Sequence, residues 1–181
     1  VIGGVVLNRC VGGLNLDAVI TSQQMGGKFV WFPTVDADNH LRFIKTRNLV
    51  DEDYIPGQYG GITVLDANGD IKPEVLEILE YVSKTSMVLA SGHLSPVEIK
   101  ALMPFLSDFG ITKFVVQHPD LHLINLTVDD QVWLAQQGCY IEKCLLTLLP
   151  DYGSKSVQQF FDELQKHGHP RPEQIVMPGN V

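Results

Sequence analysis

The chain has 181 residues, of which 45% are hydrophobic and 19% charged, and its formal net charge is −8. This composition is typical of one globular domain with a sizeable core. The acidic balance disfavours a nucleic-acid binder, and no apolar run approaches the roughly 20 residues that a membrane-spanning helix needs. We expect a small-molecule partner and neither a nucleic-acid nor a membrane partner. The three cysteines, Cys10, Cys139 and Cys144, are expected to be reduced thiols of a cytoplasmic protein.

Short apolar runs alternate with amphipathic helical stretches along the chain. Strands are predicted at about 2–7, 28–33, 87–91, 113–117, 139–145 and 174–177. Helices are predicted at 73–84, at 95–110 after a Ser-Pro-Val-Glu capping pattern, at 127–138 and at 154–166. Near-continuous apolar strands are typical of sheets covered on both faces. Strand–helix alternation at this spacing therefore predicts parallel βαβ units.

The polar residues that end successive strands favour a barrel of the (β/α)₈ TIM-barrel type over a doubly wound sheet. These residues are Asn8, Thr34, His93, His118 and Glu142. Such residues suit a ring that converges on one centre, and no Gly-x-Gly-x-x-Gly motif follows a strand. A complete barrel has about 250 residues, so we expect a partial barrel of about six strands, strands three to eight. Its open edges predict a homo-oligomer.

The stretch 35–72 is too long for a simple strand–helix loop. An apolar run at 62–65 and an Asn68-Gly69 turn predict a β-hairpin. Asp66, Asn68 and Asp70 resemble the start of a calcium loop, but the distal Glu is missing, so the hairpin is preferred. The chain is therefore read as one domain, 1–181, with a lid or hairpin insertion at about 35–72 over the active face.

His93 and His118 carry the strongest functional signal. Each follows a strand, and the two strands are consecutive, with one helix between them. Imidazole is a common ligand of zinc, and catalytic zinc sites use about three protein ligands and a water. For either histidine taken alone, the simpler interpretation is that it ends its strand and makes a local hydrogen bond. Their equivalent positions favour a shared divalent metal, with zinc first and manganese or iron as alternatives.

Other polar residues each have more than one open interpretation. His40, with Asn39, is either a substrate contact, a proton shuttle, a ligand or an exposed loop residue. Glu142 either acts on a metal-activated water or forms a salt bridge, and Lys143 beside it points to the opposite face of the strand. Gly12 and Gly13 form either a phosphate-binding turn or a plain turn with Asn15 as helix cap.

An ordered set of motifs resembles DUF6282, a group of amidohydrolase-like, metal-dependent hydrolases without an assigned substrate. The motifs are Gly3–Asn8 with Val11–Asn15, Val30–Thr34 with Asn39-His40, Ser91–Ser95, and His118-Pro119. The resemblance covers almost the whole chain. It implies the amidohydrolase superfamily, whose (β/α)₈ barrel carries a His-x-His on strand one, a Lys or Glu on strand four in many members, a His on each of strands five and six, and an Asp on strand eight.

On this resemblance His93 falls on strand five and His118 on strand six, and the His-x-His strand is absent. The strand with Trp31 and Thr34 offers no bridging Lys or Glu, and Asn180 stands near the place of the family Asp. The resemblance implies a metal-activated water that attacks a small-molecule amide, ester or related bond. The alternatives are a decarboxylase or C–C lyase on the same site, or a degenerate, non-catalytic barrel that binds a small acidic ligand.

Overall fold

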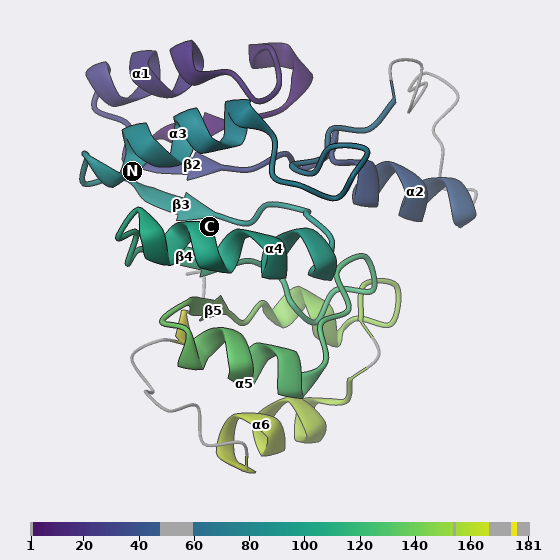
Figure 1. The fold of residues 1–181 in the computed structure, drawn as a ribbon. Helices are drawn as coiled ribbons and strands as arrows, with labels where there is room; N and C mark the ends of the chain where they lie inside the picture. Colours follow the sequence, from purple (N-terminus) through teal and green to yellow (C-terminus); the bar gives the residue numbers. More distant parts are fainter. Residues whose placement is uncertain (1, 48–59, 154, 167–174, 177–181) are drawn as a thin grey trace.

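The computed structural model describes residues 2–47, 60–153, 155–166 and 175–176 as a mixed α/β fold (Figure 1). The strands are β1 (Gly4–Val6), β2 (Phe29–Trp31), β3 (Val88–Ala90), β4 (Phe114–Val116), β5 (Tyr140–Glu142) and β6 (Ile175–Val176). The α-helices are α1 (Leu16–Gln24), α2 (Asp38–Thr46), α3 (Pro73–Ser83), α4 (Pro96–Asp108), α5 (Val128–Gln136) and α6 (Val157–Lys166). Short 3₁₀ turns follow β1 at Arg9–Val11 and β5 at Leu145–Leu148.

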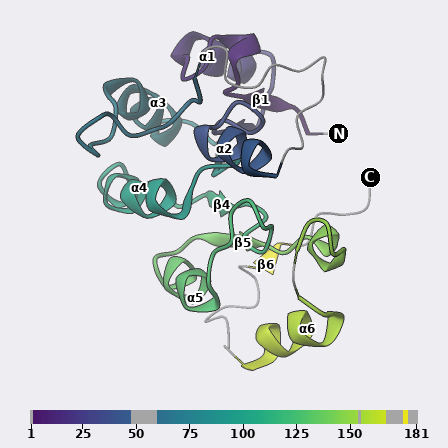
Figure 2. The same ribbon diagram turned by 90° about the vertical axis from the view of Figure 1, so that its right-hand side faces the viewer.

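The strands form one parallel sheet in which spatial order follows chain order, from β1 to β6. Right-handed crossovers between such strands place their helices on the same face. Figure 2 shows α1, α3, α4 and α5 in an arc along one side of the sheet. The order never reverses, so this is not a doubly wound sheet, in which ligands bind at a reversal of strand order.

The prediction of parallel βαβ units is confirmed, and each of the six predicted strand regions contains a strand. The TIM-barrel type of the expected partial barrel is not confirmed, because within the described residues β1 pairs only with β2, and β6 only with β5. The sheet of the described chain is therefore open. The carboxyl ends of its strands nevertheless lie at one edge, because every pair is parallel.

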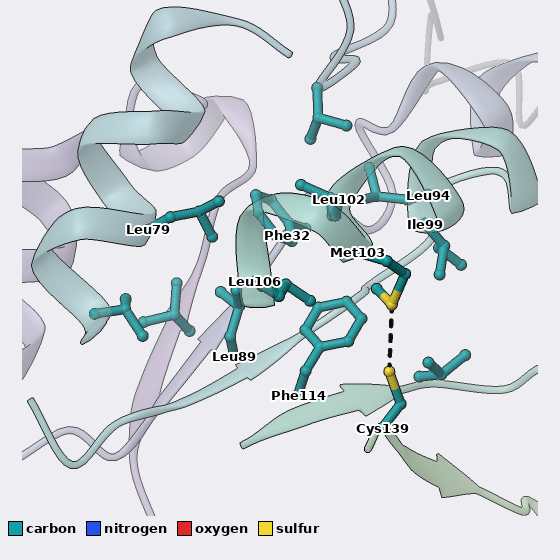
Figure 3. Packing of buried hydrophobic residues seen from close by; sticks show 14 of the residues in the cluster. Phe32, Leu79, Leu89, Leu94, Ile99, Leu102, Met103, Leu106, Phe114 and Cys139 are labelled. Carbon is teal, nitrogen blue, oxygen red and sulfur yellow. Dashed lines mark hydrogen bonds between the residues drawn. The ribbon is translucent and has the colours of Figure 1, made fainter. Parts of the chain in front are cut away.

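Alternate strand residues point to the helices and form the core, as the period of two along a strand requires. Val30 and Leu89 are fully buried and lie opposite each other in the β2–β3 register. Leu89 and Phe114 pack against Leu106 of α4, and Cys139 donates to the sulfur of Met103 at 3.5 Å (Figure 3). Strand residues of the other face, such as Trp31 and Tyr140, are only partly buried.

Helix α4 begins with the predicted capping box. The Glu98 amide donates to Ser95 Oγ at 3.3 Å, and the Ser95 amide donates to Glu98 Oε2 at 2.9 Å. Glu98 is buried, and its other oxygen accepts hydrogen bonds from the Thr63 hydroxyl (2.6 Å) and the Val64 amide (3.1 Å). The cap therefore also fixes the 63–64 segment against the body of the fold.

The stretch 35–72 contains helix α2, which was not predicted, and a short form of the predicted hairpin. The two arms of the hairpin pair through one antiparallel bridge, Leu65 to Ile71, and the Lys72 amide donates to the Val64 carbonyl at 3.0 Å. The predicted turn is present: the Asp66 carboxylate accepts from the Asn68 and Asp70 amides, at 2.8 and 3.0 Å. These bonds close the turn between the two arms of the hairpin. Residues 48–59 of the predicted insertion lie outside the described residues.

Candidate functional site

Gly92 places His93 at the end of β3. Its φ of +55° lies in the left-handed region, and a Cβ there would overlap the carbonyl oxygens of Phe32 and Pro33. Only glycine allows this close passage beneath the end of β2. The next amide, that of His93, donates to the Pro33 carbonyl at 2.9 Å. The backbone of His93 is therefore fixed by the neighbouring strand end.

His118 occupies a strained backbone position at the end of β4. Its φ is +46°, which is uncommon for a residue other than glycine, and Pro119 follows it. The surrounding chain holds this conformation through the Leu121 amide, which donates to the His118 carbonyl at 2.9 Å. Strain of this kind concentrates at functional sites. The backbone conformation of His118 therefore favours a functional role for this residue, independently of its side chain.

His40 of α2 meets His93 directly. The two Nδ1 atoms lie 2.8 Å apart, and the rings stack with centroids 4.9 Å apart and planes 8° apart. Asn39 holds α2 in this place, because its Nδ2 donates to the carbonyls of His93 (3.3 Å) and Leu123 (2.9 Å). Asn39 and His40, predicted as substrate contacts, therefore lie beside His93, and Asn39 has a structural role as well.

Burial keeps the imidazoles of this pair neutral. The pKa of His93 is lowered to about 3, first by burial and then by repulsion from His40 and His118. Burial also lowers the pKa of His40, against an opposing effect of the Asp36 carboxylate. Neutral imidazole is the form that ligates metals, so the pair is suited to that role near neutral pH.

His118 and Glu142 form a second pair. His118 Nδ1 and Glu142 Oε1 lie 2.8 Å apart, yet the two atoms are not aligned for a hydrogen bond, and each is buried without a hydrogen-bond partner. The other oxygen of Glu142 accepts from Gln117 Nε2 at 3.2 Å. Orphaned buried atoms are uncommon and call for an explanation such as a ligand.

The cluster of His40, His93, His118 and Glu142 is formed by these two pairs, which meet where the rings of His93 and His118 lie 6.1 Å apart. Imidazole nitrogens with one carboxylate are a donor set that zinc uses. As the side chains stand, however, no three His, Cys, Asp or Glu groups of the described chain converge on one metal position. The donors thus fit a metal by chemistry, but a shared centre would require a side chain to turn.

Asn8 and Thr34 hold the framework of the strand ends. Asn8 Nδ2 donates to the Thr34 hydroxyl, and the Thr34 amide donates to Asn8 Oδ1, both at 2.9 Å. The Arg9 amide donates to Asp36 at 2.8 Å. These bonds link the ends of β1 and β2. Asp36 was not singled out in the sequence, although its charge acts on His40.

The Gly12–Gly13 turn favours the plain-turn interpretation. The two amides donate to the carbonyls of Arg9 (2.8 Å) and Asn8 (3.0 Å), so neither is available to a phosphate. Asn15 caps α1, as expected, by accepting from the Asp17 amide at 3.0 Å.

A buried ion pair behind the site was missed by the sequence analysis. Lys143 Nζ lies 2.7 Å from Asp120 Oδ2, with 2% and 1% of the two side chains exposed. Burial alone would raise the pKa of Asp120, but Lys143 and Lys155 outweigh it and hold that pKa below its usual value. The orientation of Lys143 away from Glu142 was the one available signal, and it did not identify a partner.

A cavity of about 460 Å³ lies away from the cluster, at the amino ends of β4 and β5. Its walls include Met103, Phe114, Cys139 and Tyr140. Burial raises the pKa of the Cys139 thiol to about 12, so this cysteine is not a nucleophile at neutral pH. All three cysteines are free thiols.

The remaining histidines and Asn180 do not join the cluster among the described residues. His122 is partly exposed beside the Pro150 carbonyl, at 3.3 Å. Asn180, His167 and His169 lie outside the described residues.

Among the helices that the structure describes, none has the length and apolar character to cross a membrane.

Comparison with known proteins gives one positive result. The family model DUF6282, described as a family of unknown function, matches residues 1–142, which carry all four residues of the cluster. Neither the curated proteins nor the solved structures contain a match. The chain therefore belongs to the DUF6282 family.

Proposed function

We propose that this protein is a metal-dependent hydrolase of the amidohydrolase type, with a site at the strand ends of a (β/α)₈-type barrel. The observation that carries the proposal is the gathering of three imidazoles and a carboxylate from β2–α2, β3, β4 and β5 at one edge of the sheet. Catalytic residues of parallel α/β barrels come from the carboxyl ends of several strands.

The ligands in this proposal are His93 and His118. The pKa of His93, about 3, keeps it in the form that ligates metal. The Nδ1 of His118 makes no hydrogen bond, although it lies 2.8 Å from Glu142 Oε1, so its lone pair would be available to a metal if Glu142 turned away. His40 orients the His93 ring through the Nδ1 contact, as partners of metal-bound histidines do. Zinc suits this donor set best, and manganese or iron are alternatives.

A bound divalent ion would lower the pKa of a water molecule and polarise a carbonyl or phosphoryl oxygen of the substrate. Glu142 then accepts the proton of the attacking water. It is held for this task by Gln117 Nε2, which binds one carboxylate oxygen and leaves the other without a hydrogen bond. General-base catalysis of this kind contributes a factor of about 10²–10⁴.

Helix α2 supplies the substrate contacts. A cavity of about 430 Å³ is lined by Asn39, Arg42, Phe43, Ser95 and Leu123, among others. Asn39 links this cavity to the cluster only through the backbone, because it donates to the His93 carbonyl; no residue of the cluster lines the cavity. In this proposal Asn39 and His40 of α2 contact the substrate from the α2 side, beside His93.

A second candidate is a non-catalytic barrel that binds a small acidic ligand. The arrangement of the donors as two separate pairs favours it, because no three of them share one centre as they stand. The hydrolase turns over its substrate, whereas the non-catalytic candidate only binds its ligand. A decarboxylase or C–C lyase would use the same residues and differ in its products.

The test is a screen of small chromogenic amides and esters with protein reconstituted with zinc. We expect hydrolysis by the wild type, and a loss of about 100-fold or more in Glu142→Gln with the zinc content unchanged. His122→Ala serves as the control, since His122 lies outside the cluster. Turnover that survives Glu142→Gln would contradict the role of this carboxylate, and no turnover by zinc-loaded wild type would favour the non-catalytic candidate.

A further inference from the structure

The Asp120–Lys143 ion pair lies directly behind the His118–Glu142 pair. Asp120 follows His118 by two residues, and Lys143 follows Glu142 by one. Because neighbouring side chains of a strand point to opposite faces, Glu142 contacts His118 and Gln117 while Lys143 contacts Asp120. The same two chain segments are therefore joined twice, once on each side of β5.

Every charge of the buried pair is satisfied by a hydrogen bond. Gln131 of α5 bridges the two residues: its Oε1 accepts from Lys143 Nζ at 2.5 Å, and its Nε2 donates to Asp120 Oδ1 at 2.9 Å. Lys155 donates to the same Asp120 oxygen at 2.6 Å. Lys143 Nζ also lies 5.7 Å from the centre of the Phe160 ring. Such an arrangement has one well-defined geometry.

A buried ion pair is weak evidence for stability, because apolar replacements of the same shape are often as stable. Its better-supported role is to select one arrangement of the chain. Here that arrangement includes the left-handed backbone of His118, which costs free energy and needs support from its surroundings. Asp120 lies in the turn that this backbone begins, where the Leu121 amide donates to the His118 carbonyl.

We propose that Asp120 and Lys143 are positioning residues, whose buried ion pair fixes the His118 imidazole against the Glu142 carboxylate. The proposal rests on the proposed metal site only for its effect on metal affinity. Its effect on the orientation of His118 is independent of any metal. Gln131 takes part as the bridge between the two charges.

The test is the double variant Asp120→Asn, Lys143→Met, which removes both charges and keeps the side-chain volumes. Two quantities are measured: the ¹⁵N imidazole NMR signals of His118 without metal, and the zinc affinity. We expect several broadened His118 signals instead of one set, and zinc binding weakened by about 10-fold or more. Lys100→Met is the control, because it removes a different lysine–aspartate pair, Lys100–Asp130 at 2.6 Å, which joins α4 and α5 away from the cluster.

A folded double variant with wild-type His118 signals would overturn the proposal. Folding is monitored by thermal unfolding. If the double variant does not fold, Asp120→Asn alone replaces it. This variant breaks the ion pair with Lys143 at nearly the same side-chain shape, and unchanged His118 signals in it would equally overturn the proposal. A wild type that binds no zinc would refute the proposed function, while the His118 signals would still decide the positioning role.

Discussion

His40 and His93 face each other through their Nδ1 atoms at 2.8 Å, although 53 residues separate them in the chain. Two neutral imidazoles can make this contact only if one nitrogen carries the proton and the other accepts it. The contact therefore fixes the tautomer of one ring relative to the other. It also makes α2 part of the cluster at the ends of β3, β4 and β5.

Replacement of His40 by alanine should raise the pKa of His93. Burial is the largest cause of the low pKa of about 3, and repulsion from His40 is the next. The variant reduces both effects, because it removes a neighbour and admits water. An NMR titration of the metal-free protein measures the change, with His122→Ala as control. His93 titrating at the wild-type pH in His40→Ala would show that the contact has no electrostatic effect.

The stability of the metal-free protein should fall as the pH decreases below 6.5. In that range the unfolded chain binds a proton at His93, while the folded chain does not bind one until about pH 3. The contribution of His93 is thus fully present above pH 6.5 and is lost progressively toward pH 3. The slope from this one group is at most about 1.4 kcal/mol per pH unit.

Urea unfolding at several pH values measures this slope, and His93→Asn isolates the contribution of His93. The carboxylates that titrate in the same range remain in the variant, so the difference between the two curves belongs to residue 93. We expect the variant curve to be flatter between pH 6.5 and pH 4. Parallel curves would contradict a depressed pKa of His93.

Gly92→Ala should destabilise the fold by about 3 kcal/mol, because the new methyl group overlaps two carbonyl oxygens and the left-handed backbone is strained. Gly110→Ala is the matched control: Gly110 has a φ of +67° but no atom within 4 Å of the added Cβ. Its cost should be about 1–2 kcal/mol, from the backbone alone. Chemical denaturation measures the free energy of unfolding of both variants. Equal losses would show that the carbonyl oxygens of Phe32 and Pro33 do not restrict the side chain at position 92.

The strands and the strand-end histidines could be predicted because both depend on local patterns. Apolar runs indicate strands, and the ends of parallel strands lie at one edge of the sheet, so the pattern alone predicts that His93 and His118 lie close together. Helix α2 was missed, because the chain around Asp38 has weak helix signals and no side-chain cap. The Asp120–Lys143 pair could not be foreseen, since nothing in 23 residues of separation indicates which groups meet in the interior.

The central claim is that His93 and His118 bind a divalent metal. The most direct measurement is elemental analysis of protein purified without chelator, beside a His93→Ala, His118→Ala double variant and the His122→Ala control. The account predicts near-stoichiometric zinc, manganese or iron in the wild type and the control, and none in the double variant. Equal metal in all three proteins, or no metal in a folded wild type supplied with zinc, would contradict it.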